Sequence, residues 1–248
     1  MEKNKVKKKK KNLEPQQERS RESLQKLLKA AIEVLGQHGV EGATIPRIAR
    51  HAGLTPGSVY RRFHDKEALL ETAILGMLER QDENLRTMTP EIARAIPLAV
   101  FAEQIINSIV VAYRARAPLI RAMRRFVQGR AHTAFWRKAD RLETRTYEQL
   151  VSLFLTHAER INHPDPRTAV ATGLMMVIST VMELVVTHKD LSTWNGLLPG
   201  DDQALKRELV RAFLSYLCVE KLPVPAGKIE KEQTAAANRW RERSSRNV

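Results

Sequence analysis

A chain of 248 residues, 43% of them hydrophobic, is long enough for a small module and a larger domain with its own core. Eleven glycines and eleven prolines favour helices over a turn-rich β fold, and a single cysteine excludes an internal disulfide framework. No apolar signal segment follows the N-terminal charges, and the apolar run 174–186 is too short and too polar to cross a bilayer. We therefore expect a cytoplasmic protein with no membrane partner.

The net charge of +14 is concentrated near the N-terminus, which indicates an anionic partner such as DNA. Residues 1–66 hold 16 Lys and Arg against 7 Asp and Glu, a net charge of +9. Residues 1–12 contain seven lysines, one glutamate and no periodic apolar residues, so we predict a disordered basic arm over residues 1–18. This arm either tracks phosphates or an adjacent minor groove, or is a solvated tail that only raises general affinity.

The first regular helix is predicted to begin near Ser20, because apolar residues then recur on one helical face. Gly36 and Gly39 mark its end. The residues of this stripe are Leu24, Leu27, Leu28, Ala31, Ile32 and Leu35. A helix with such a stripe has to pack against the elements that follow it.

Two short helices separated by a tight turn are predicted next. Thr44 is a good N-cap for a helix over 45–51, and Gly53 follows at a position where a helix usually ends in a left-handed residue. Thr55, followed by Pro56, caps a second helix over 56–63. The pattern is that of a helix-turn-helix that places its second helix in the DNA major groove, or of an ordinary helical hairpin with a polar outer face.

The order Thr-x3-Ile-Ala-x2-Ala-Gly-Leu-Thr-x-Gly-x-Val-Tyr-x2-Phe-x2-Lys-Glu-x-Leu, over residues 44–69, resembles the tetracycline-repressor (TetR) family of bacterial transcription regulators. The resemblance extends over about residues 20–78. It implies an all-α protein with an N-terminal three-helix DNA-binding domain at 19–80, its motif at 44–63, and a larger helical effector-binding and dimerisation domain at 88–222. Pro46 is a departure, because many relatives carry a polar residue there, near a phosphate.

The candidate DNA contacts divide by chemistry. Side chains that can reach base edges, with arginine to guanine as the commonest contact, are Thr55, Ser58, Arg61 and Arg62. The groups expected to hold phosphates are Tyr60, Lys66, Thr44 and the backbone at Pro46. Pro56 begins the second helix, and Gly57 lets it approach the groove closely.

The rest of the chain reads as successive helices, with Asp65 capping the first of them. Their predicted ranges are 66–86, 97–116, 118–129, 133–161, 167–188 and 203–220. A mobile tail is predicted at 223–248. The apolar run 174–186 is either the central helix of a monomeric core or part of a homodimer interface; the resemblance implies that the last two helices pair with those of a second subunit.

An effector site is expected in the second domain. Residues 114–145 hold ten Lys and Arg against two Asp and Glu, which is either a mouth for an anionic effector or a set of solvated helix faces. Side chains that could line an apolar pocket, or could simply be core, are Met123, Phe126, Phe135, Trp136, Met175, Met176 and Met182. Glu183 either reads the effector or forms an interface ion pair.

No catalytic, cofactor or metal site is predicted. The seven histidines are scattered without metal-ligand spacing, and the sequence contains no phosphate-binding glycine loop or nucleophile motif. We therefore predict a homodimeric, ligand-responsive transcriptional regulator, more specifically a repressor. It would bind a palindromic operator and be released from it by an apolar or anionic small molecule. The alternatives are a non-specific or nucleoid-type DNA-binding protein and an all-helical enzyme or carrier.

Overall fold

The computed structural model describes residues 2–187, 194, 197 and 201–218 of the chain. Every regular element in this part of the chain is a helix, which confirms the predicted all-α class. The predicted tail at 223–248 lies outside the described residues.

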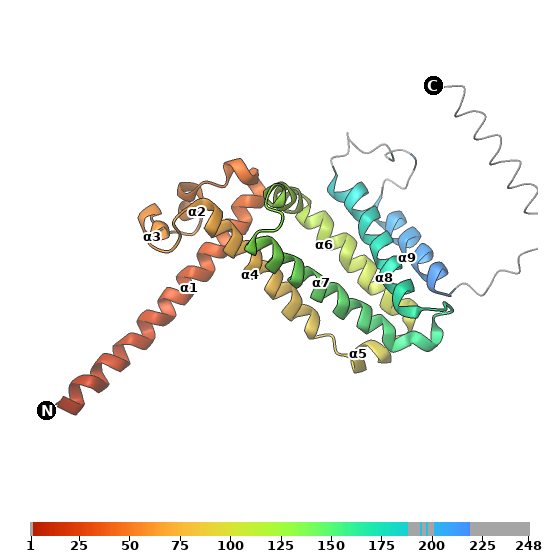
Figure 1. Ribbon diagram of the computed structural model, residues 1–248, viewed down its shortest axis with the longest axis horizontal. Coiled ribbons are helices and arrows are strands. Elements are labelled where there is room, and N and C mark those ends of the chain that lie inside the picture. The colour runs from red at the N-terminus through yellow and green to blue at the C-terminus, as the bar shows by residue number, and fades with distance from the viewer. Residues whose placement is uncertain (1, 188–193, 195–196, 198–200, 219–248) are drawn as a thin grey trace, which may run out of the picture.

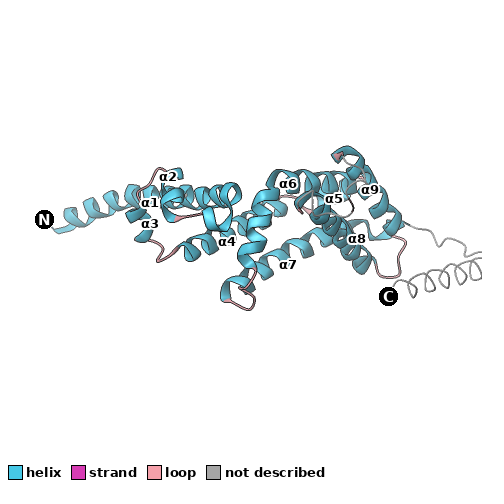
Figure 2. Cartoon of the chain, turned by 90° about the horizontal axis from the view of Figure 1, so that it is seen from above, coloured by secondary structure: helices cyan, strands magenta, loops and turns pink. Residues whose placement is uncertain are grey.

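The N-terminal head occupies one end of an elongated molecule (Figures 1 and 2). Its elements are α1 (Glu2–Gly42), α2 (Ile45–His51), α3 (Pro56–Tyr60) and α4 (Lys66–Arg86). α1 is interrupted at Gly39, whose φ of 67° departs from helical geometry near the predicted end of this helix.

The start of α1 corrects one prediction. Residues 2–18 were expected to be disordered, yet they continue α1 as a helix. Lysine has a high intrinsic helix propensity, and a segment that extends an existing helix needs no nucleus of its own. The low apolar content of the arm therefore did not decide its secondary structure.

The second half of the fold is a bundle of longer helices. Its elements are α5 (Pro90–Ala95), α6 (Leu98–Val127), α7 (Ala134–Phe154) with a 3-10 turn (Leu155–Arg160), α8 (Pro166–Val181) with a π-turn (Met182–Val186), and α9 (Asp202–Cys218). The helix predicted over 133–161 therefore tightens to 3-10 geometry after Phe154.

A single helix, α6, replaces the two that were predicted to meet at Pro118. Proline removes one backbone hydrogen bond within a helix, which usually ends it. Here both flanks of Pro118 are buried, with Val110 in one hydrophobic cluster and Ala122 in another. We attribute the continuity of α6 to this packing on both sides of an exposed proline.

Two hydrophobic clusters stabilise the fold, and the first extends beyond the head. It joins α1–α4 to the end of α6 and the start of α7, where Phe126 meets Phe135 edge-on at 5.8 Å between ring centroids. The second is centred on Phe154, whose ring lies 4.8 Å from that of Phe101 and 5.1 Å from that of Phe213. The core of the head is thus completed by residues far beyond its predicted boundary at 80–88.

Two helices, α6 and the segment 166–186, are long and apolar enough to cross a membrane by length and composition alone. The second is longer than the predicted apolar run because it includes the first turns of α8. Core helices of other folds meet the same criterion, and both helices here contribute buried residues to the second cluster.

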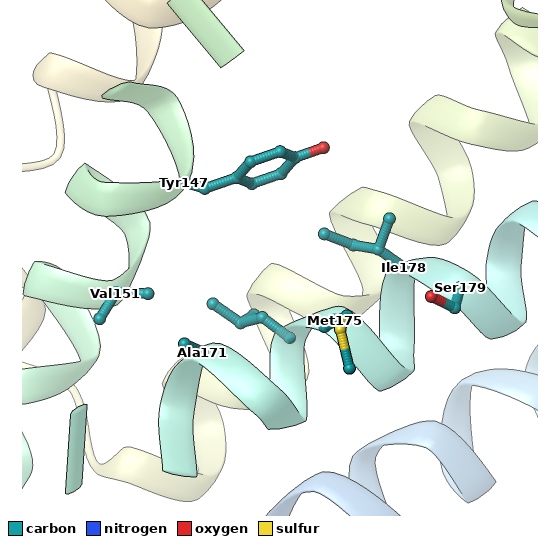
Figure 3. A pocket seen from close by; sticks show the side chains of 7 residues that line it. Tyr147, Val151, Ala171, Met175, Ile178 and Ser179 are labelled. Atoms are coloured by element: carbon teal, nitrogen blue, oxygen red, sulfur yellow. The ribbon is translucent and has the colours of Figure 1, made fainter. Parts of the chain in front are cut away.

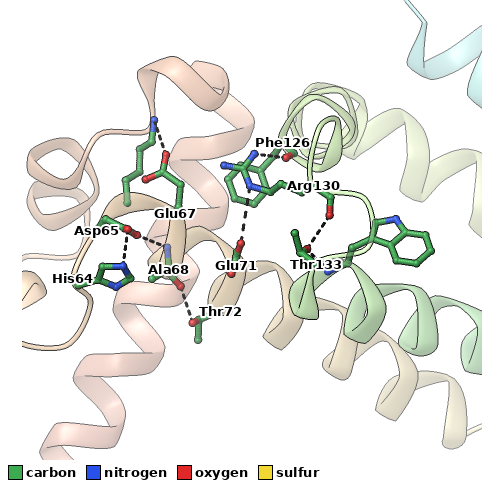
Figure 4. Close-up of polar contacts among 11 residues, drawn as sticks. His64, Asp65, Glu67, Ala68, Glu71, Thr72, Phe126, Arg130 and Thr133 are labelled. Carbon is green, nitrogen blue, oxygen red and sulfur yellow. Dashed lines mark hydrogen bonds and ion pairs between the residues drawn. The ribbon is translucent and has the colours of Figure 1, made fainter.

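Ion pairs join α4 to the α6–α7 corner and to α7 along much of its length. They are Glu71–Arg130 (4.0 Å), Glu79–Lys138 (2.9 Å) and Asp82–Arg145 (2.6 Å). At the first of them, Arg130 also stacks on the Phe126 ring at 3.9 Å and donates to the Phe126 carbonyl at 2.6 Å (Figure 4). α4 therefore belongs to both halves of the molecule.

Candidate nucleic-acid interface

The turn between α2 and α3 has the local geometry that the sequence predicts. Thr44 Oγ1 accepts from the Arg47 backbone N–H at 3.4 Å, and Thr55 Oγ1 accepts from the Ser58 backbone N–H at 3.3 Å. Gly53 has a φ of 67°, which only glycine adopts at low cost. Both caps and the left-handed residue are thus confirmed.

α3 is shorter than predicted. It ends at Tyr60, and Arg61, Arg62 and Phe63 form the turn that follows rather than a further helical turn. Val59, which is fully buried, is its one residue in the head core, while Leu54 and Phe63 pack against that core from either side. This single anchor leaves most of α3 facing outward.

The outer face of α3 is open and basic. Tyr60 is 56% exposed, and Arg61 is exposed, with a side chain that forms no hydrogen bond or ion pair within the described part of the chain. A Cβ atom built on Gly57 would meet nothing within 4 Å, so no group in the described part of the chain covers this position. The other exposed residues that were predicted to contact DNA here are Thr55, Pro56 and Arg62, while Ser58 is half-buried.

Two of the predicted DNA contacts are held by the protein itself. Arg62 Nη2 donates to Ser20 Oγ of α1 at 3.2 Å, and Lys66 Nζ donates to the Val40 carbonyl at 3.4 Å. These partners lie 42 and 26 positions away in sequence, so spacing could not indicate them. The guanidinium of Arg62 is exposed and retains further N–H donors. Lys66 is half-buried, with its ammonium bonded to the end of α1.

Asp65 fixes the start of α4 beside this face. Its Oδ1 accepts from the Ala68 backbone N–H at 2.7 Å, and its Oδ2 lies 2.8 Å from His64 Nε2 (Figure 4). The predicted cap is confirmed, and α4 begins at Lys66 as predicted.

Sequence reasoning missed two arginines on the exposed side of α2. Arg47 donates to the Gly42 carbonyl at 2.9 Å, and Arg50 is exposed, with a side chain that has no hydrogen bond or ion pair among the described residues. Their spacing of three places them on one helical face with exposed Pro46, which was the available signal. The basic surface therefore includes both helices of the motif.

A family model described as bacterial regulatory proteins, tetR family, matches residues 27–73, which include α2, α3 and the start of α4. Over these residues the chain is similar to the tetR family. The proteins that this model describes are bacterial regulatory proteins.

Named relatives agree with this similarity. The chain is 40% identical over 55 residues to the uncharacterized HTH-type regulator TtgW of Pseudomonas putida, a match to 22% of this chain and 41% of TtgW. It is 27% identical over 158 residues to the regulator BetI of Vibrio atlanticus, covering 62% of this chain and 76% of BetI. The chain thus spans less than half of TtgW but about three quarters of BetI.

Solved structures of transcriptional regulators share the fold over most of the chain. A regulator assigned to the tetR family from Mesorhizobium loti superposes with a TM-score of 0.62 at 21% identity, covering 81% of this chain and 99% of the other. FadR from Bacillus subtilis, solved with stearoyl-CoA, gives a TM-score of 0.53 at 17% identity over 78% and 97% of the two chains.

An apolar groove of about 270 Å³ lies between α7 and α8 (Figure 3). It is lined by Tyr147, Val151, Ala171, Leu174, Met175, Ile178 and Ser179. Tyr147 shares a side-chain hydrogen bond with Tyr113 of α6, and burial raises the pKa of both tyrosine hydroxyls. The groove therefore offers apolar walls and one hydroxyl pair that stays protonated at neutral pH.

The residues predicted to bind an effector do not converge on this groove. Phe126 is fully buried in the first cluster with Met123 packed against that cluster, and Trp136 lies 5.5 Å from the His132 ring between centroids. Met176 is 41% exposed on α8, next to the groove residue Met175. Helical pattern alone could not separate core positions from groove positions.

Glu183 is half-buried in the π-turn that follows α8. Its side chain has no hydrogen bond or ion pair in the described part of the chain. Both of its predicted roles, reading an effector and pairing across an interface, stay predictions.

Two arginines of the predicted anionic mouth are already paired within the bundle. Arg114 binds Asp202 of α9, with Nε 3.2 Å from either carboxylate oxygen, and Arg121 donates to the Val186 carbonyl at 2.7 Å. These contacts join α6 to α9 and to the π-turn after α8, so they stabilise the bundle.

Proposed function

We propose that this chain is a ligand-responsive transcriptional repressor that acts in the cytoplasm. It binds a palindromic operator as a homodimer and is released by a small-molecule effector. The observation that carries the proposal is the outer face of α3, a helix fixed by its Thr55 cap and by buried Val59. Exposed Tyr60 projects from this helix, and Arg61, whose side chain has no partner in the part of the chain that the structure describes, follows directly.

In this proposal α3 reads the major groove. Arg61 contacts a base, with Thr55 and Ser58 beside it, and Arg62 reaches DNA with the donors that its bond to Ser20 leaves free. Tyr60 and Lys66 hold phosphates together with Thr44 and the backbone at Pro46, and exposed Arg50 extends this contact along α2. Gly57 provides the close approach.

The homodimer forms through α8 and α9. Met175 is 60% exposed and Met176 41% exposed on the outer side of α8, an unusual exposure for side chains of this size. A second copy that covers this face would bring two α3 helices into a two-fold arrangement, as a palindromic operator requires.

The effector of this proposal occupies the groove between α7 and α8. The groove is apolar, and two arginines of the predicted anionic mouth, Arg114 and Arg121, are already paired, so an apolar ligand is the better fit. The stearoyl-CoA with which FadR from Bacillus subtilis was solved is consistent with an apolar chain in a protein of this fold.

Selection of bound sites from random DNA fragments tests this function. We expect recovery of sites with two-fold symmetry. Arg61→Ala should relax the preference at one base pair of each half-site and cost about 1–3 kcal/mol on the selected operator only. Arg50→Ala should weaken binding to operator and scrambled DNA alike.

Arg94→Ala, at an exposed arginine of α5, is the matched control and should leave both affinities unchanged. Recovery of no enriched site, or equal losses on the two DNAs for Arg61→Ala, would contradict sequence-specific reading by α3.

A further inference from the structure

We propose that residues 2–12 of α1 form a second DNA-contacting surface, which binds the phosphates of the duplex flanking the operator. The inference rests on the proposed function, because it requires α3 to be placed on an operator. It goes beyond that function in assigning a role to a part of the chain outside the helix-turn-helix.

The position of α1 relative to α3 is the first step. Arg62, two residues after the end of α3, donates to Ser20 of α1 at 3.2 Å, so α1 passes beside the end of α3 at residue 20. From there the helix continues outward to Glu2, and its N-terminal part projects from the same end of the molecule that carries α3 (Figure 1).

The reach of this helix is the second step. Eighteen residues separate Glu2 from Ser20, and a rise of 1.5 Å per residue gives a projection of about 27 Å. A duplex rises 3.4 Å per base pair, so this length corresponds to about 8 base pairs. The helix is therefore long enough to leave the base pairs under α3 and to reach flanking DNA.

The charge of the segment is the third step. Residues 3–11 contain seven lysines and no acidic residue. Three of the lysine pairs, 3 with 7, 5 with 9 and 7 with 11, have the i,i+4 spacing at which like charges destabilise a helix. A row of phosphates relieves this repulsion, so a polyanion is the partner that the segment fits.

The apolar content argues for DNA rather than a lipid surface. Val6 is the only apolar residue between positions 2 and 12, whereas a helix that lies in a membrane interface needs a continuous apolar face. The segment is also continuous with the helix that supports the DNA-binding motif. Its contact is sequence-independent and depends on salt.

The test compares the full-length protein with the triple variant Lys7→Gln, Lys8→Gln and Lys9→Gln. Each binds two duplexes, the selected operator alone and the same operator extended by about 10 base pairs of arbitrary sequence on both sides. We expect the wild type to bind the extended duplex more tightly and with a steeper dependence of log affinity on log salt. The variant should lose that difference, with a slope reduced by up to about 0.9 for each phosphate contact removed.

A matched control removes three positive charges elsewhere, with Arg94→Gln, Arg116→Gln and Arg167→Gln at exposed positions of α5, α6 and α8. It should keep the flank dependence. Equal flank dependence in the lysine variant and the wild type would overturn the inference, as would a slope that falls equally on both duplexes. If the wild type instead bound operator and scrambled DNA with equal affinity, the proposed function itself would be refuted.

Discussion

The carboxylate of Asp82 in α4 accepts two hydrogen bonds from the guanidinium of Arg145 in α7, at 2.9 and 2.6 Å. Asp82 is fully buried, and Arg86 lies 3.1 Å from the same carboxylate. The pair joins α4, which leaves the DNA-binding head, to α7, which lines the apolar groove. Arg145 lies only two residues before the groove residue Tyr147. We therefore expect a displacement of α7 at the groove to be transmitted to α4 through this pair.

Arg145→Ala should destabilise the protein more than the loss of an exposed ion pair does. It leaves a buried carboxylate with Arg86 alone, so we expect a cost of about 1–3 kcal/mol, below the about 3–5 kcal/mol typical of an isolated buried pair. Lys138→Ala, which breaks the exposed Glu79 pair between the same helices, should cost less than about 1 kcal/mol. Urea unfolding of both variants measures the two losses, and equal losses would show that the buried bidentate pair has no special weight.

Gly57→Ala should separate DNA binding from stability. No protein atom lies within 4 Å of the added Cβ, and alanine is favoured over glycine in a helix by up to about 1 kcal/mol, so thermal stability should stay the same or rise. Affinity for the selected operator should fall, because the methyl group stands where the backbone of α3 has to approach the groove. Unchanged affinity in a titration of labelled operator would contradict close approach at this position.

Gly173→Ala should disturb the packing of α8 on α9. The added Cβ would lie 2.8 Å from the Phe213 ring, so that ring or its helix has to move, at a cost of about 1–3 kcal/mol. The dimer proposed to form through these helices should then dissociate at a higher protein concentration, which sedimentation measures.

Gly76→Ala in α4 is the matched control for this change. The nearest atom to its added Cβ is Arg80 Nη1 at 3.7 Å, an ordinary contact, so stability should not fall. Destabilisation of both variants to the same extent would mean that helix backbone effects, not the Phe213 contact, explain the result.

Asp165 should make the start of α8 sensitive to acid. Hydrogen bonds from the Thr168 hydroxyl at 2.5 Å and the Thr168 backbone N–H at 3.1 Å hold the pKa of this carboxyl below its ordinary value of 3.8. A carboxyl with a lowered folded-state pKa contributes stability above its unfolded-state pKa, and that contribution is lost as the pH falls through the folded-state pKa. Wild-type stability should therefore drop further than that of Asp165→Asn on acidification below about pH 4.

Asparagine is as good an N-cap as aspartate, so this substitution removes the titrating charge and retains the cap. Denaturant unfolding at about pH 7 and about pH 3 measures the loss of stability in the wild type and in Asp165→Asn. These pH values lie on either side of the ordinary aspartate pKa. Parallel losses in the two proteins would show that Asp165 does not contribute to acid sensitivity.

The starts of α2, α3 and α4 were predictable because the interactions that cause them are local. The bonds that cap α2, α3 and α4 connect residues only three positions apart, from Thr44, Thr55 and Asp65. The left-handed turn at Gly53 depends on that residue alone. Such features are present in the sequence itself as residue type and spacing, and so is the basic, outward face of α3.

Tertiary contacts decided the remainder. The bond of Arg62 to Ser20, the burial of Phe126 in the head core and the continuation of α6 through Pro118 all depend on residues brought together from distant parts of the chain. The groove at Tyr147 likewise exists only where α7 and α8 diverge. Local spacing fixes which residues can share a helical face, but the free energy of packing, summed over many distant contacts, determines which face is buried and which remains open to a ligand.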